Sequence, residues 1–254
     1  MNMKCKFCFK DKKPVDAHII PRCFFETMRI RGDNRSFQLL SNTKNEHPRK
    51  SRIGLYDNNI LCKECENIFH DYDDYACKTL LSDIDKYDHI LNPHNEKEIG
   101  YKLDNINYKI LKLFFISVLW RASVSEKKEF SAVNCISDLF KDRLKEMIRN
   151  SNPGDANDFL VIVRKFTDNL GKNFLMDPYK LQIKKINFYR FYLGGGYEFN
   201  IKVDETILEE SDVLYAFSLK PENTFYVLFR DNLISSKEFP ILKDILNKPE
   251  NSQL

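Results

Sequence analysis

Apolar residues recur at helical or strand spacings over much of the chain, and polar stretches separate them. Residues 23–31 predict a short helix, whereas the polar, aperiodic residues 32–52 predict a loop. From the Cys65 position to about residue 86, apolar side chains recur every three to four positions, which predicts a helix. Its apolar positions are Ile68, Phe69, Tyr72, Tyr75, Ala76 and Leu80. Residues 92–104 predict a linker.

The second half of the chain changes from helical to strand spacing. Residues 105–122 are largely apolar and predict a buried helix, and residues 129–149 predict an amphipathic one. Gly194–Gly196 predict a hairpin turn, because the strand and helix that flank a glycine-rich nucleotide loop are not indicated there. Strands are predicted at residues 159–166, 181–193, 197–203, 213–219 and 224–229, and a last helix at 238–247.

These segments predict an α+β protein in two parts. The first part, residues 1–91, is expected to be a compact module. The second part, residues 105–254, is expected to combine helices with an antiparallel sheet, and its role is not indicated. No apolar run is long enough to span a bilayer, so no membrane partner is expected.

Two Cys-x-x-Cys pairs lie in the first part, Cys5 with Cys8 and Cys62 with Cys65. Four thiolates in two closely spaced pairs are the ligand set of a closed, tetrahedral structural zinc site. Each pair, which we call a knuckle, presents two sulfurs to one metal ion. The segment of about fifty residues between the knuckles is then a loop fixed at both ends. The sequence therefore predicts structural Zn²⁺ in residues 1–91.

The remaining cysteines give no sign of a disulfide framework. The N-terminal residues are polar and basic, unlike a signal peptide, and the total of seven cysteines is odd. A redox Cys-x-x-Cys belongs near a βαβ pattern, which flanks neither pair. We therefore expect a cytoplasmic protein in a reducing compartment. Cys23, Cys77 and Cys135 have apolar or helical neighbours and are expected to be ordinary buried thiols.

Charge is distributed unevenly, although the whole chain carries only +3. Residues 1–56 contain thirteen Lys and Arg against five Asp and Glu, whereas residues 57–100 contain four against eleven. The basic segment can bind a polyanion such as DNA. Its expected contacts with the phosphates are Arg49, Lys50 and Arg52. The acidic segment can hold a divalent cation. The alternative is that both segments are ordinary solvated surfaces.

A histidine lies between the two knuckles, where it is expected to be accessible for catalysis. His18 leaves a short β-type stretch and can act as general base on a water molecule, while Asn58 can orient the loop that carries it. On the helix after the second knuckle, Glu66 and His70 are one turn apart. They are expected to hold a divalent metal, Mg²⁺, Mn²⁺ or Ni²⁺, that binds a scissile phosphate.

Together these motifs resemble a known family. The order Cys-x-x-Cys, His-Ile-x-Pro and Asn-x-x-x-Cys-x-x-Cys, followed by a helix, is similar to the zinc-knuckle HNH endonucleases, or ββα-metal nucleases. The resemblance covers about residues 4–75 and implies a DNA endonuclease with His18 as its general base. Asn58, or its neighbour Asn59, matches the family's central asparagine. The family's last metal ligand falls at Glu66, Asn67 or His70.

The sequence departs from this family at one position. The residue before the general-base histidine is usually Asp, Glu or His and ligates the catalytic metal, but here it is Ala17. Asp16 lies one step further back and, in a strand, would point to the same side as His18. Asp16 is therefore an open candidate for the ligand that Ala17 cannot provide.

Two function classes follow. The first is a metal-dependent DNA endonuclease, which by analogy with proteins of this build would serve a restriction or anti-phage system. The second is a non-catalytic zinc-knuckle protein that binds nucleic acid, or an adaptor whose second part recognises a protein partner. In both classes Asp71, Asp73 and Asp74 are expected to be solvated carboxylates, and Arg121 to cap a buried helix.

Overall fold

A mixed seven-stranded sheet forms the centre of the computed structural model, which describes residues 2–28, 54–173, 175–222, 224–230 and 232, and the backbone alone at 37–39 and 49–51. The strand order is β10-β11-β12-β9-β13-β8-β7. Neighbours are antiparallel except β9 and β13, which are parallel. The α+β class is therefore confirmed, whereas the expected purely antiparallel sheet is wrong, because β9 and β13 pair in parallel. The strands are β7 (Asp88–Leu91), β8 (Glu98–Asp104), β9 (Val161–Phe166), β10 (Tyr179–Ile183), β11 (Ile186–Leu193), β12 (Tyr197–Lys202) and β13 (Thr224–Arg230).

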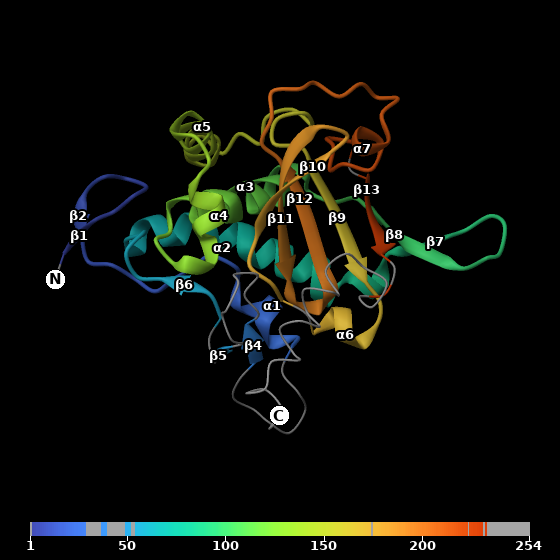
Figure 1. The fold of residues 1–254 in the computed structure, drawn as a ribbon, viewed down its shortest axis with the longest axis horizontal. Coiled ribbons are helices and arrows are strands. Elements are labelled where there is room, and N and C mark those ends of the chain that lie inside the picture. The colour runs from blue at the N-terminus through green and yellow to red at the C-terminus, as the bar shows by residue number, and fades with distance from the viewer. Residues whose placement is uncertain are drawn as a thin grey trace.

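Helix α3 (Tyr108–Val124) packs against this sheet, and α2 (Lys63–Cys77) lies beside α3 (Figure 1). Helix α3 is apolar on nearly all sides, so burial between the sheet and α2 stabilises it. Its first turn is capped by Asn107, whose side chain accepts a hydrogen bond from the Ile110 N–H at 3.1 Å. The other helices are α1 (Arg22–Glu26), α4 (Ser131–Asn134), α5 (Asp138–Arg149), α6 (Asn169–Lys172) and α7 (Val213–Ala216). No helix in the described ranges is long and apolar enough to cross a membrane.

The N-terminal segment adds short strand pairs and shares the core of the sheet. The pairs are β1 (Met3–Lys4) with β2 (Asp11–Lys12), β3 (Ala17–His18) with β6 (Tyr56–Asp57), and β4 (Phe37–Leu39) with β5 (Arg49–Ser51). The Phe7 ring from the first knuckle lies 5.2 Å from the Trp120 ring of α3. The Phe69 ring of α2 stacks on Trp120 at 5.8 Å and lies 5.5 Å from the Phe7 ring, so the three rings form one cluster. One hydrophobic core thus joins both parts of the chain.

Several predicted elements agree with the structure, and others do not. The predicted loop at 32–52 contains the paired strands β4 and β5, and the strand predicted at 181–193 is two strands, β10 and β11, joined by a turn. The helix predicted at 129–149 is interrupted between α4 and α5.

The predicted linker at 92–104 is wrong, because it contains β8, whose Tyr101 and Leu103 side chains are buried. The predicted strand at 213–219 is also wrong. It begins with α7, which Asp212 caps by accepting a hydrogen bond from the Leu214 N–H at 2.7 Å. The predicted helix at 238–247 lies outside the described residues.

The predicted hairpin turn at Gly194–Gly196 is confirmed, since it joins the antiparallel strands β11 and β12. Gly195 and Gly196 have φ of +76° and +86°, where glycine is favoured. A Cβ on Gly194 would lie 1.6 Å from the Phe24 carbonyl oxygen of α1. This close approach lets α1 pack directly against the turn.

The expectation that Cys23 and Cys77 are free thiols is wrong, because they form a disulfide. The bond joins α1 to the end of α2, and the Cα–Cα distance of 6.2 Å is usual for a disulfide. The two residues are 54 positions apart, so their approach depends on the packing of both helices. Cys135 was also expected to be buried, but it is exposed.

Loss of this disulfide is expected to lower the free energy of unfolding by about 3 kcal/mol, because the unfolded chain regains the entropy of an open loop. Thermal and urea denaturation of Cys23→Ser and wild type, both loaded with zinc, measure the difference. Cys135→Ser is the control, since it removes an exposed cysteine outside the bond. Equal midpoints for Cys23→Ser and wild type would contradict the expected contribution.

Candidate metal centre and active site

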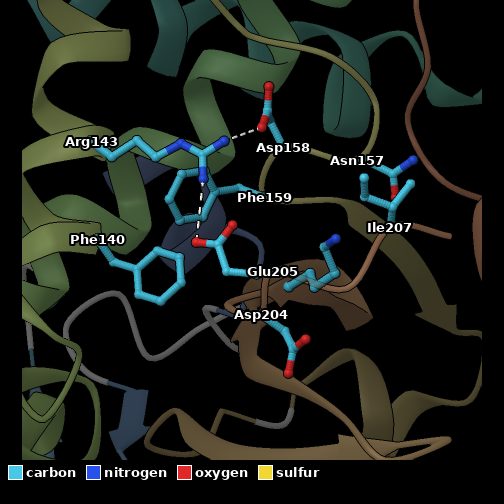
Figure 2. A pocket seen from close by; sticks show the side chains of 9 residues that line it. Phe140, Arg143, Asn157, Asp158, Phe159, Asp204, Glu205 and Ile207 are labelled. Atoms are coloured by element: carbon cyan, nitrogen blue, oxygen red, sulfur yellow. Dashed lines mark hydrogen bonds and ion pairs between the residues drawn. The ribbon is translucent and has the colours of Figure 1, made fainter.

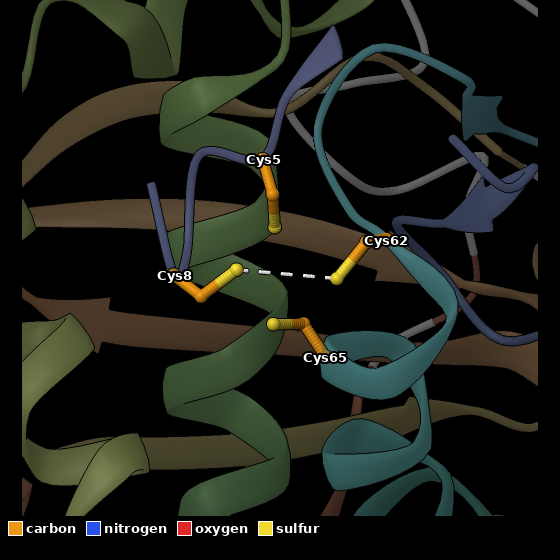
Figure 3. A group of neighbouring side chains, drawn as sticks. All are labelled: Cys5, Cys8, Cys62 and Cys65. Carbon is orange, nitrogen blue, oxygen red and sulfur yellow. Dashed lines mark hydrogen bonds between the residues drawn. The ribbon is translucent and has the colours of Figure 1, made fainter. Parts of the chain in front are cut away.

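The four knuckle cysteines come together, as the sequence predicts. Cys5 and Cys8 follow β1, while Cys62 and Cys65 lie at the start of α2, and their sulfurs point into a common space (Figure 3). All four Sγ atoms lie within 4.8 Å of one another. Tetrahedral zinc with Zn–S bonds of about 2.3 Å needs sulfurs about 3.8 Å apart. The group can therefore hold a metal ion such as zinc after a small contraction.

Backbone hydrogen bonds shape the first knuckle and join it to the second. The Phe9 N–H donates to the Cys5 oxygen at 2.8 Å, and Phe9 takes a φ of +59° to close the turn. The Lys6 N–H donates to the Ile60 oxygen at 2.9 Å, just before the second knuckle. Burial raises the pKa of the Cys65 thiol. A metal ion would therefore have to displace a firmly held proton from this sulfur.

His18 lies where three segments of the chain meet. Strand β3 ends at His18, opposite Tyr56 of β6, and α2 follows β6 directly. The His18 side chain is half-buried, and its ring lies 6.3 Å from the Tyr56 ring. Two short antiparallel strands and a helix are thus arranged around the predicted general base.

Glu66 of α2 reaches back to this strand. Its carboxylate accepts a hydrogen bond from the His18 backbone, and burial of the side chain raises its pKa. Its second oxygen, Oε2, is buried and has no hydrogen-bond partner within the described structure. A buried carboxylate oxygen without a partner is costly unless a cation or a water molecule satisfies it. Glu66 Oε2 could therefore accept a contact from a cation or from a water molecule near His18.

The His70 side chain does not point into the interior beside Glu66. Its side chain is 73% exposed, and its Nε2 lies 3.4 Å from Asp74 Oδ2, one turn further along α2. Of the residues that the structure describes, only the four cysteines form a group of three or more potential ligands at metal-binding distance. Asp16 is exposed and Ala17 is buried.

The residues around the predicted asparagine position also stabilise the local fold. Asp57 is buried and accepts hydrogen bonds from the Asn59 N–H at 2.9 Å and from Ser125 Oγ at 2.7 Å. These contacts fix the end of β6 to the loop after α3. Asn58 is exposed at the surface next to them. Asn59 is exposed as well, and only its backbone N–H is held, so both asparagine side chains are accessible at this position.

Asp73 and Arg121 are the site residues that sequence reasoning missed. The prediction that Asp73 is solvated is wrong, because its carboxylate forms a bidentate ion pair with Arg121. The Nη2–Oδ1 distance is 2.7 Å and the Nη1–Oδ2 distance is 2.8 Å. Arg121 is fully buried and donates a hydrogen bond to the His18 carbonyl oxygen. The predicted role of Arg121 as a helix cap therefore does not describe all of its contacts. The two residues are 48 positions apart, and no local pattern in the sequence connects them.

The predicted phosphate contacts cannot be located by side chain. Arg49 and Lys50 lie in β5, which the structure describes only as backbone, and Arg52 lies outside the described residues. Of the basic residues that are described, Lys6 pairs with Glu126 at 2.7 Å and Lys12 pairs with Glu64.

A separate pocket of about 180 Å³ lies between α5 and the loop after β12 (Figure 2). Its polar side chains already have partners, either within the pocket or beside it. Arg143 pairs with Asp158 and, at 3.6 Å, with Glu205. Asp204 accepts hydrogen bonds from Thr206, which hold its pKa at about 2. We assign this pocket no role in the chemistry of His18.

Comparisons with protein-family models, with curated proteins and with solved structures return no match. The function is therefore argued from the site itself.

Proposed function

We propose that the protein is a metal-dependent endonuclease that hydrolyses phosphodiester bonds in DNA. The main support is the position of His18 at the end of β3, beside a buried Glu66 oxygen that lacks a partner in the described structure. The cysteine group that can hold zinc lies at the start of the same helix that carries Glu66. The motif order that resembles the zinc-knuckle HNH endonucleases agrees with this arrangement.

In this proposal, the His18 imidazole takes a proton from a water molecule as that water attacks the phosphorus. The bond from phosphorus to the leaving oxygen breaks, and that oxygen takes a proton from solvent water, giving a phosphate monoester and an alcohol, while His18 returns its proton to solvent. Glu66, with His70 after a side-chain rotation, would hold a divalent ion, whose charge stabilises the phosphorane-like transition state. Asn58 would orient the segment that follows β6. The zinc held by the cysteines is structural, because four thiolates leave no open position for substrate.

DNA is the proposed substrate because of the charge of residues 1–56. Lys10 and Lys13 of this segment lie near the first knuckle and are exposed or partly exposed. Arg49, Lys50 and Arg52 remain proposed phosphate contacts. A role in restriction or anti-phage defence stays an analogy with proteins of this build.

Glu66→Gln is expected to raise the Mn²⁺ concentration needed for half-maximal plasmid nicking by about tenfold or more, because an amide is a much weaker ligand than a carboxylate. The assay follows nicking of supercoiled plasmid after brief chelation and addition of Mg²⁺, Mn²⁺ or Ni²⁺. Glu64→Gln is the matched control, since Glu64 is an exposed carboxylate of the same helix. An unchanged Mn²⁺ requirement in Glu66→Gln would remove Glu66 from the metal site.

One observation favours the alternative of a non-catalytic zinc protein that binds nucleic acid. Ala17 occupies the position where the family usually has a metal ligand, and the described residues assemble no second group of three ligands. A folded, zinc-loaded protein that binds DNA but nicks plasmid with none of the three metals would support this alternative. In that case, the adaptor role would also be tested, by a search for a protein partner of residues 105–254.

A further inference from the structure

The backbone of His18 is fixed on both sides of its Cα atom. On one side, the His18 backbone donates a hydrogen bond to the Glu66 carboxylate. On the other side, the His18 carbonyl oxygen accepts a hydrogen bond from Arg121 Nη1 at 2.6 Å. Arg121 belongs to α3, 103 residues further along the chain. With both peptide groups held, the imidazole keeps only its two side-chain torsions.

Arg121 uses its whole guanidinium group for this arrangement. Besides the His18 oxygen, it donates to both Asp73 oxygens, to the Ser117 carbonyl at 3.3 Å and to Ser117 Oγ at 3.1 Å. These five hydrogen bonds match the five N–H groups of arginine. The side chain is 0% exposed. The orientation of its planar guanidinium group is therefore fixed by these acceptors.

Asp73 fixes Arg121 to the helix that carries Glu66. The bidentate ion pair joins α2 to α3, and the same guanidinium group donates to His18 of β3. The Phe69 ring is also on α2. Its centroid lies 5.2 Å from the guanidinium carbon of Arg121, so the ring packs against that group. Helix α2 thus contacts both peptide groups of His18, through Glu66 directly and through Asp73 by way of Arg121.

We propose that Arg121 and Asp73 are positioning residues for His18, which set where its imidazole meets the attacking water. This inference rests on the proposed role of His18 as general base. A buried ion pair is not needed for stability alone, since apolar residues of similar volume often replace one without loss. Here the pair also holds the backbone of the reacting residue, and a misplacement of about 1 Å can lower a rate about a hundredfold.

Arg121→Lys tests the proposal, because lysine keeps the charge but offers three donors from one atom. Lysine can neutralise Asp73, but it cannot serve both Asp73 oxygens and the His18 carbonyl in the same plane. We expect kcat for plasmid nicking to fall by about tenfold or more, with KM within about twofold, since DNA binding is left intact. Zinc content should stay at the wild-type value.

A second measurement does not depend on activity. The imidazole C–H cross-peak of His18, assigned by its loss in His18→Gln, reports the surroundings of the ring in zinc-loaded, DNA-free protein. In Arg121→Lys this cross-peak should shift or split, because the ring samples more than one position. Asp73→Asn, which leaves one acceptor oxygen for Arg121, should give the same change in smaller measure and replaces Arg121→Lys if that variant does not fold.

Lys112→Met is the matched control, because Lys112 is a fully buried lysine on the same helix whose Nζ donates to the Ala156 carbonyl instead of to His18. It should leave the His18 cross-peak and kcat unchanged. A folded Arg121→Lys protein with the wild-type cross-peak and kcat would overturn the inference while leaving the nuclease proposal standing. A shifted cross-peak in a protein whose wild type never nicks DNA would support the positioning and overturn the nuclease proposal.

Discussion

Cys62→Ala is expected to lose its bound zinc and to unfold the N-terminal segment at temperatures where the wild type is stable. Cys62 is 1% exposed, and its sulfur faces Cys8 at 4.0 Å. Three remaining thiolates bind zinc far more weakly than four, and the free energy of zinc binding is also free energy of folding. The first knuckle carries Phe7 into the core beside Trp120, so its release exposes that contact to water.

The measurements are zinc per chain by atomic absorption and the thermal midpoint by circular dichroism. Cys135→Ala is the matched control, because Cys135 is exposed and lies outside the cysteine group. It should keep one zinc per chain and the wild-type midpoint. If Cys62→Ala retained full zinc and the same midpoint as this control, the four-cysteine site would be refuted.

His18→Ala is expected to lower the nicking rate by about a hundredfold or more, the usual contribution of a general base. Zinc content and the thermal midpoint should change little. The reason is specific to this site: Glu66 and Arg121 contact the backbone of His18, and alanine preserves that backbone. Only the half-buried imidazole is lost.

The control for this substitution is His94→Ala, which removes an exposed imidazole from the turn between β7 and β8. It should nick at the wild-type rate. Nicking by His18→Ala at the rate of His94→Ala would show that another group activates the water. A loss of zinc in His18→Ala would mean that His18 supports the metal site instead.

The cysteine group could be predicted from sequence because its geometry is local. Each Cys-x-x-Cys turn brings two sulfurs together, and the metal then requires the two turns to meet. The long buried helix was equally clear, since residues 105–122 lack a polar face and match α3 closely. The role of Glu66 as a metal ligand stays a prediction, and its contact with His18 was not foreseen.

The remaining features depend on packing between distant segments. Arg121 and Asp73 lie on different helices, and a charged residue in sequence gives no sign of whether a partner will bury it. The Cys23–Cys77 disulfide likewise requires α1 and the end of α2 to meet. Strand β8 was missed because the polar residues 92–97 directly before it favoured a linker, although Glu98, Lys102 and Asp104 alternate with apolar residues as in a half-buried strand.

Nicking of supercoiled plasmid by the zinc-loaded wild-type protein tests the central claim most directly. The protein is chelated briefly, its zinc is counted, and the formation of nicked circles is then timed with Mn²⁺ or with excess EDTA. The account predicts nicking with Mn²⁺, none in EDTA, and at least about a hundredfold less in His18→Ala at equal zinc content. No nicking with Mg²⁺, Mn²⁺ or Ni²⁺ by a folded protein that holds its zinc, or equal nicking by His18→Ala, would contradict it.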